Sequence, residues 1–274
     1  MGDELDDGLA IEVASDAGSG SDAGAGGGGA ASSSAAGGAA GGAGAAARRR
    51  AKQKLNRRRR ALKGHERTSA ERELATQPAA LQADYICAQQ RGVHASLSAL
   101  ELDEVRVSEH NLIETVGWTE RTAETLPAFL RRFVDVPMDA APGAPRIVVV
   151  CGNAQRAADL VRPLRKLIGR RPDATVAKLF ARHFKANAQG AWLREHRAPL
   201  AVGTPHRLRQ LLDGGSLSLA DAAALVIDHS WVDQKGRTIF DGPETRTAVV
   251  DLIGAPAVRA ALRRGQGACR IVLF

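Results

Sequence analysis

The sequence predicts an α/β fold in which a mostly parallel sheet is covered by helices on both faces. From residue 146 onward, short apolar runs alternate with segments of helical spacing, a pattern typical of repeated strand and helix units. The run RIVVVC at residues 146–151 is apolar at nearly every position, as expected for a strand buried on both faces. These two observations favour a parallel sheet over an antiparallel one.

Two helices are expected before the first strand. Residues 71–90 have apolar side chains at helical spacing, and Pro78 favours a helix that begins near that position. The second helix, at residues 120–134, is predicted by a stripe of apolar residues spaced i, i+3, i+4 and i+7: Leu126, Phe129, Leu130 and Phe133. The breaker DAAPGAP then separates this helical part from the sheet.

Strands and helices alternate after the breaker. Strands are predicted at residues 146–151, 175–180, 198–205, 222–231 and 269–274. Helices are predicted at residues 153–169, 206–215 and 242–254, and Gly169 is expected to end the first of them.

The composition divides the chain into three parts. Residues 1–47 hold seven acids and no base, with twelve glycines between Gly18 and Gly44, so we expect a disordered acidic tail rich in glycine and alanine. Residues 48–67 hold eleven lysines and arginines against the single acid Glu66, and we expect a basic arm. Residues 68–274 are expected to form the α/β domain with a helical extension at its N-terminus.

The basic arm is the strongest functional signal from composition, because each phosphate that a cation neutralises releases a counterion. Its candidate RNA-binding residues are Arg48, Arg49, Arg50, Lys52, Lys54, Arg57, Arg58, Arg59, Arg60 and Lys63. The same clusters suit a nuclear import signal, and the two roles are compatible. The alternative is a solvated charged linker.

Cysteine usage and hydropathy restrict the environment of the protein. Cys87, Cys151 and Cys269 are odd in number and widely spaced, and we expect them to be reduced core residues. No apolar stretch approaches the roughly 20 residues that span a bilayer, so we expect a soluble protein with no membrane partner.

Two strand ends resemble motifs of the DEAD-box RNA helicases. The segment AVGTPHRLRQLL, at residues 201–212, is similar to the helicase strand, loop and helix that carry Thr-Pro-Gly-Arg. The segment ALVIDHSW, at residues 224–231, is similar to the helicase strand that carries Asp-Glu-Ala-Asp. The order and spacing resemble a single RecA-like lobe. This resemblance implies RNA contact by Thr204 and Arg207, although a threonine-capped helix with solvent-facing arginines is the alternative.

The nucleotide site of those helicases has no counterpart in the sequence. A P-loop needs a Gly-Lys pair whose lysine neutralises phosphates, and no Gly-Lys dipeptide occurs in the chain. In those helicases a glutamate follows the aspartate at the strand end, and His229 occupies that position here. We therefore expect no nucleotide, no metal, no cofactor and no catalytic residues, and an ATP-dependent RNA helicase is the alternative.

Four longer motifs resemble the Cms-one ribosomal small subunit protein family. They are LSALELDEVRVSEHNLIETVGW, AKLFARHFK, VGTPHRLRQLLDGGSLSL and VIDHSWVDQKGRTIFD, within residues 70–274. The resemblance implies a degenerate helicase lobe in the nucleus and nucleolus, with precursor rRNA and proteins of the small-subunit pre-ribosomal particle as partners. It predicts a non-enzymatic assembly factor, and a general basic adaptor unrelated to ribosomes is a further alternative.

The strand end at Asp228, His229 and Ser230 resembles a catalytic triad in residue types only. Adjacent strand residues point to opposite faces, so consecutive positions cannot assemble one. We expect Asp228 to cap the following loop and Trp231 to pack over the sheet edge or face a partner. For residues 233–235, DQK, a hydrogen-bonded turn and a partner contact are both open.

Overall fold

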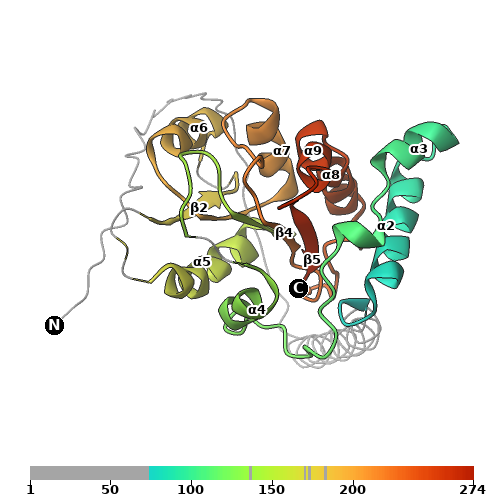
Figure 1. Cartoon of the computed structure of the whole chain (residues 1–274), viewed down its shortest axis with the longest axis horizontal. Helices are drawn as coiled ribbons and strands as arrows, with labels where there is room; N and C mark the ends of the chain where they lie inside the picture. The colour runs from blue at the N-terminus through green and yellow to red at the C-terminus, as the bar shows by residue number, and fades with distance from the viewer. Residues whose placement is uncertain (1–73, 136–137, 170, 172–173, 182–183) are drawn as a thin grey trace, which may run out of the picture. The chain divides into compact units, whose positions relative to one another are not determined.

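The computed structural model describes residues 74–135, 138–169, 171, 174–181 and 184–274 (Figure 1). The predicted acidic tail and basic arm lie outside these residues. The described part contains a parallel sheet of five strands in the order β2-β3-β1-β4-β5, with helices on both faces. The predicted α/β fold with a parallel sheet is therefore confirmed.

Each strand has four residues, which are apolar except for Lys178 in β2 and Arg270 in β5. In sheet order they are β2 (Val176–Leu179), β3 (Leu200–Gly203), β1 (Ile147–Val150), β4 (Ala224–Ile227) and β5 (Arg270–Leu273). Alternate residues along each strand contribute to two separate cores: Ile147 and Val149 belong to one, whereas Val148 and Val150 belong to the other. Burial on both faces explains why β1, β3 and β4 are apolar throughout.

The two faces of the sheet carry different numbers of helices in the described part of the chain. One face packs against α4 (Leu126–Phe133) and α5 (Ala154–Ile168). The other core includes residues of α2 (Ala79–Val93), α6 (Ala186–Glu195), α7 (Pro205–Asp213), α8 (Pro243–Ile253) and α9 (Pro256–Leu262). Figure 1 shows α4 and α5 on the opposite side of the sheet from α6 and α7.

The predicted helices differ mainly in where they begin. α2 starts directly after Pro78, as its sequence indicates. The helix predicted at residues 120–134 begins only at Leu126, because residues 122–125 form a turn and Pro127 occupies the first helical turn. α5 begins after Asn153, whose side chain accepts a hydrogen bond from the backbone N–H of Arg156, and ends at Gly169, where φ is 74°.

Four short elements were not predicted from the sequence: α3 (Ala99–Val105), α6, α9 and the 3-10 helix η1 (Glu109–Asn111). α3 begins with a capping box between Ser98 and Glu101 and buries none of its residues. Arg263, which follows α9, donates a hydrogen bond to the backbone carbonyl of Glu104 and holds α3 against the domain.

The chain also reaches the outer edge of β5. Leu112 forms a single parallel bridge with Ile271, and the N–H of Ile113 donates to the carbonyl of Ile271 at 2.9 Å. A loop then leads from this bridge to α4, so the path resembles a strand, loop and helix at the sheet edge. Within the described residues, no helix has the length and apolar character needed to cross a membrane.

Candidate functional site at the carboxyl edge of the sheet

The parallel strands bring three loops together at the carboxyl edge of the sheet. Val150 is paired with Gly203 on one side and with Ile227 on the other, so β1, β3 and β4 end at the same level. The residues that follow them are Cys151, Thr204 and Asp228. Ligands of open parallel sheets bind at this edge, which makes it the candidate site.

A buried ion pair joins α5 to the loop that follows β4. Nε of Arg156 donates to Oδ2 of Asp228 at 2.8 Å, and Nη2 donates to Oδ1 at 3.1 Å. The side chains are 8% and 1% exposed. Asp228 thus binds α5 in place of the expected capping of its own loop, and both of its carboxylate oxygens are engaged.

The ion pair also sets the charges at the edge. Burial alone lowers the pKa of the Arg156 guanidinium, but the hydrogen bonds and charge of Asp228 outweigh it, so the pKa is raised. Burial raises the pKa of Asp228, and Arg156 opposes that effect. Cys151, which is fully buried beside them, has a raised pKa from burial and from the charge of Asp228, so its thiol stays protonated.

His229 faces the other layer, as strand alternation predicts. Its ring lies 5.7 Å from the ring of Tyr85 on α2 and 5.9 Å from that of Phe240, measured between centroids. Burial lowers the pKa of His229 to about 4, so the imidazole is neutral at pH 7. Asp228 and His229 therefore point into different cores and cannot act as one catalytic unit.

The loop after β4 is held to the end of the sheet. The backbone N–H groups of His229 and Ser230 both donate to the carbonyl of Phe274 at 2.8 Å. Trp231 then turns back over the ion pair, with its ring 5.7 Å from Cζ of Arg156. This half-buried tryptophan covers the edge of the sheet, as one of the two sequence expectations proposed.

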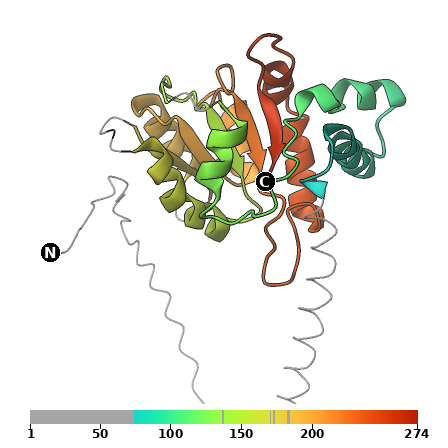
Figure 2. The same cartoon turned by 60° about the horizontal axis from the view of Figure 1, so that its bottom comes forward.

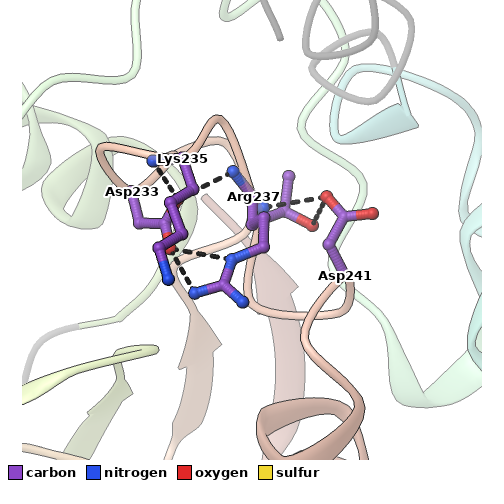
Figure 3. Close-up of polar contacts among 5 residues, drawn as sticks. Asp233, Lys235, Arg237 and Asp241 are labelled. Atoms are coloured by element: carbon purple, nitrogen blue, oxygen red, sulfur yellow. Dashed lines mark hydrogen bonds and ion pairs between the residues drawn. The ribbon is translucent and has the colours of Figure 1, made fainter. Parts of the chain in front are cut away.

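The DQK segment forms a hydrogen-bonded turn around Asp233 (Figure 3). Oδ1 of Asp233 accepts from the backbone N–H groups of Lys235 and Arg237, and Oδ2 accepts from the Arg237 guanidinium at 2.8 and 3.0 Å. Gly236 takes a positive φ of 71° inside the turn. Burial opposes the shift, but these hydrogen bonds lower the pKa of Asp233 and keep it charged.

A second acid extends this ordered loop. Oδ2 of Asp241 accepts from the backbone N–H of Thr238 at 2.9 Å and from its hydroxyl at 3.1 Å. Asp233 is thus a structural residue of the turn, whereas Gln234 and Lys235 are exposed. The hydrogen-bonded turn is therefore confirmed at Asp233, and a partner contact by Gln234 and Lys235 stays a prediction.

A pocket of about 120 Å³ opens beneath this loop. Its lining comes from the loops after β1 and β4 and from the start of α8: Gly152, Asn153, Trp231, Asp233, Arg237, Thr238, Ile239, Gly242 and Thr245. No group of three or more metal-ligating acids, histidines or cysteines occurs among the residues that the structure describes.

Arg207 is buried rather than solvent-facing, with 7% of its surface exposed. Its Nη1 donates to the carbonyl of Phe184 at 3.0 Å and to Oε1 of Gln189 at 2.5 Å. Nε2 of Gln189 in turn donates to the carbonyls of Lys178 and Phe180. Arg207 thus holds the loop after β2, and RNA contact by it stays a prediction that would compete with these bonds.

Thr204 lies beside Arg207, at the start of α7. It is the N-cap residue, and its side chain makes no capping hydrogen bond to the helix. RNA contact by Thr204 also stays a prediction. The preceding Gly203 has a structural explanation, since an added Cβ would lie 2.3 Å from the carbonyl oxygen of Leu179. The glycine of this motif therefore permits close packing of β3 on β2.

Arg121 fills the loop that leads from Leu112 to α4, a feature that sequence analysis missed. Its guanidinium donates to the carbonyls of Leu273 and Ala75 at 2.8 and 2.9 Å and to the hydroxyl of Thr115 at 2.9 Å. Burial lowers its pKa to about 10, so it stays charged at pH 7. The loop between the Leu112 bridge and α4 is therefore filled by an arginine side chain that binds backbone carbonyl oxygens.

The comparisons with known proteins agree on one family. The family model CMS1, described as a U3-containing 90S pre-ribosomal complex subunit, matches residues 31–274. Protein CMS1 of Chaetomium thermophilum is 37% identical over 188 residues, which cover 66% of this chain and 74% of that protein. Protein CMSS1 of Homo sapiens is 39% identical over 107 residues, which cover 39% of this chain and 37% of that protein. Protein CMSS1 of Xenopus laevis is 34% identical over 128 residues, which cover 47% of this chain and 44% of that protein.

Proposed function

The chain belongs to the CMS1 family of U3-containing 90S pre-ribosomal complex subunits, and from this premise we propose that it is a non-enzymatic assembly factor of the small ribosomal subunit. The family description supports a role in ribosome biogenesis, with pre-ribosomal proteins as partners. We propose further that the protein binds precursor rRNA and acts in the nucleus and nucleolus.

The ion pair between Arg156 and Asp228 is the observation that carries the non-enzymatic proposal. A magnesium ion at this strand end would need a carboxylate oxygen that is free to bind it. Both oxygens of Asp228 already accept hydrogen bonds from a guanidinium that stays charged. A metal would therefore have to displace Arg156 from a nearly fully buried carboxylate, which is strongly unfavourable.

Arg121 supports the same proposal at the neighbouring edge. A phosphate site needs free backbone N–H groups or cations directed at it. Here the cation of the loop before α4, Arg121, is instead directed at the backbone carbonyl oxygens of Leu273 and Ala75. Together with the missing Gly-Lys pair in the sequence, this arrangement favours a docking domain over an ATP-dependent helicase.

Binding to precursor rRNA rests on the charge of the arm. Residues 48–67 contain eleven bases, and such a segment binds phosphates without reading sequence. The exposed Gln234 and Lys235, presented by the ordered Asp233 turn, suit a contact with a pre-ribosomal protein. Thr204 is a further candidate contact at the carboxyl edge.

Sedimentation of a cell extract tests the proposal. The protein should travel with small-subunit precursors on a gradient at low salt and leave them at high salt, because phosphate contacts weaken steeply with ionic strength. Migration only as a free protein, with no precursor RNA in its fractions, would contradict the proposed role. Saturable ATP binding with turnover by the purified protein would instead establish the helicase alternative.

A further inference from the structure

The two faces of the domain differ in charge. The helices α4 and α5 on one face contain six arginines and lysines and one acid. The helices packed on the other face, α2, α6, α7, α8 and α9, contain six bases and five acids. The positive charge of the described helices is therefore concentrated on α4 and α5, which lie side by side in front of the sheet in Figure 2.

Four of these basic residues project from the outer side of the layer. Arg131 and Arg132 on α4 and Arg162 and Lys166 on α5 are exposed. Among the described residues, no acid forms an ion pair with any of the four. The acid of this layer, Asp159, accepts a hydrogen bond from Nε2 of Gln155 at 3.1 Å. Like charges on neighbouring helices repel one another unless an anion binds them.

The core fixes the direction of these side chains. Phe129 and Leu130 of α4 are completely buried, and the ring of Phe129 lies 4.8 Å from that of Phe274, measured between centroids. Leu160 and Leu164 anchor α5 in the same core. Arg162 and Lys166 are four residues apart, so they lie on one side of the helix, about one turn from each other. The basic surface is thus part of a rigid layer.

Compensation of the helix dipole explains only part of this pattern. Cations are favoured in the last turn of a helix, where Arg131, Arg132 and Lys166 lie. Arg162 lies before the last turn of α5 and gains little from the dipole. The effect also does not explain why the helices of the other face carry nearly balanced charges, six bases and five acids.

From this arrangement we propose that the outer surface of α4 and α5 is a second RNA-binding surface, which holds the phosphate backbone of precursor rRNA. The inference rests on the proposed binding of the protein to that RNA and extends it from the arm to the folded domain. Three of the four cations are arginines, whose forked guanidinium groups match phosphate oxygens. The surface would read no sequence, because contacts to phosphates carry no base information.

The distribution of apolar residues favours RNA over an acidic protein as the occupant. A protein interface needs apolar or aromatic anchors at its centre. The large hydrophobic residues that are exposed in the described part of the chain are Leu81, Leu100 and Val116, and none of them lies on α4 or α5. A phosphate backbone requires no such anchor.

The test uses the full chain and an unstructured polyuridine RNA. Two variants, Arg131→Gln with Arg132→Gln and Arg162→Gln with Lys166→Gln, each remove two charges from the surface. The control, Arg91→Gln with Arg106→Gln, removes two exposed charges from the other side of the domain. Thermal unfolding verifies that every variant is folded, and RNA affinity is measured over a series of salt concentrations.

We expect each surface variant to bind RNA several-fold more weakly, with its salt slope reduced by about 0.7 for each phosphate that the variant no longer neutralises. The control should retain the affinity and slope of the unchanged protein. If the surface variants and the control lose the same affinity, the effect is one of net charge alone and the inference is wrong. RNA binding by both surface variants at the level of the unchanged protein would also overturn the inference. Competition by polyglutamate as effective as that by RNA would assign the surface to an acidic protein instead.

A further variant separates this inference from the proposed function. Deletion of residues 48–63 should weaken binding but leave a salt-dependent remainder, which the surface substitutions then abolish. If the deletion alone removes all binding while the full chain still sediments with small-subunit precursors, the proposed function stands and the second surface does not exist. If the full chain neither binds RNA nor sediments with precursors, both proposals fail.

Discussion

Arg156 on α5 and Asp228 at the end of β4 form a buried ion pair through two hydrogen bonds of 2.8 and 3.1 Å. The two residues are 72 positions apart in the sequence. Their contact joins the helix that follows β1 to the loop that follows β4. Trp231 lies over the guanidinium and shields the pair from solvent. The pair closes the edge of the sheet at which many parallel α/β proteins bind ligands.

Removal of Arg156 alone should destabilise the protein strongly. Arg156→Met leaves Asp228 buried without its partner, and such a change costs about 3–5 kcal/mol of unfolding free energy. The double variant with Asp228→Leu should recover much of that stability, because it removes the unpaired charge. Urea unfolding measures all three proteins.

An exposed ion pair provides the matched control. Arg197 and Asp139 lie 3.8 Å apart with side chains 58% and 96% exposed, so Arg197→Gln should change stability by less than about 1 kcal/mol. A double variant no more stable than Arg156→Met would show that the destabilisation comes from packing and not from the unpaired carboxylate.

His229 should make the stability of the protein fall in mildly acidic solution. Its pKa is about 4 in the fold, below the ordinary value of about 6.5, so unfolding takes up a proton between these values. The stability that the neutral imidazole contributes is fully present above pH 6.5 and is lost as the pH falls toward 4. The expected slope from this residue is about 1.4 kcal/mol per pH unit.

The substitution His229→Phe tests this expectation, since a phenyl ring can keep the contacts with Tyr85 and Phe240. Unfolding free energies at pH 7 and pH 4.5 should differ less in the variant than in the unchanged protein. His206→Gln, which changes an exposed histidine, serves as the control. An identical pH dependence of His229→Phe and the unchanged protein would exclude His229 as the source.

The sheet was predictable from sequence because its strands are buried on both faces. Continuous apolar runs such as that of β1 are sufficient for this inference, and caps such as Asn153 and Gly169 gave the bounds of α5. By contrast, α3 buries none of its residues, so it has no apolar stripe from which a helix could be read. Its capping box, Ser98 with Glu101, is the signal that could have revealed it.

The contacts of the candidate site were less accessible to sequence reasoning. Arg156 and Asp228 come from separate elements, and only the register of β1 with β4 brings them together. Arg121 binds the backbone carbonyls of Leu273 and Ala75, and a carbonyl has no signature in the sequence. The alternation of Asp228 and His229 was predictable, since it follows from strand geometry alone.

Gly203 should be intolerant of any side chain. In Gly203→Ala the new Cβ would lie 2.3 Å from the carbonyl oxygen of Leu179, so β2 would have to move away from β3. We expect the unfolding free energy to fall by roughly 1–3 kcal/mol, the usual range for overpacking, and the β2 amides to exchange hydrogen faster. Gly92→Ala in α2 is the control, because no atom lies within 4 Å of its new Cβ. That substitution should stabilise the helix by about 0.5–1 kcal/mol, and equal effects of the two changes would contradict the close-packing explanation.

Substitutions of Asp233 and Lys235 should distinguish the structural role of this loop from its proposed contact with a partner. Asp233→Ala removes the acceptor of two backbone N–H groups and of the Arg237 guanidinium, so residues 233–241 should exchange amide hydrogens faster and be cleaved more readily by protease. Lys235→Ala removes only an exposed side chain, and its amide still donates to Asp233. We expect Lys235→Ala to leave exchange and unfolding unchanged but to lower the amount of protein that sediments with small-subunit precursors. The exposed Arg194→Ala on α6 removes the same charge elsewhere and should keep full association. If Lys235→Ala associates as well as the Arg194 control, the loop is a structural element alone and the partner contact lies on another surface.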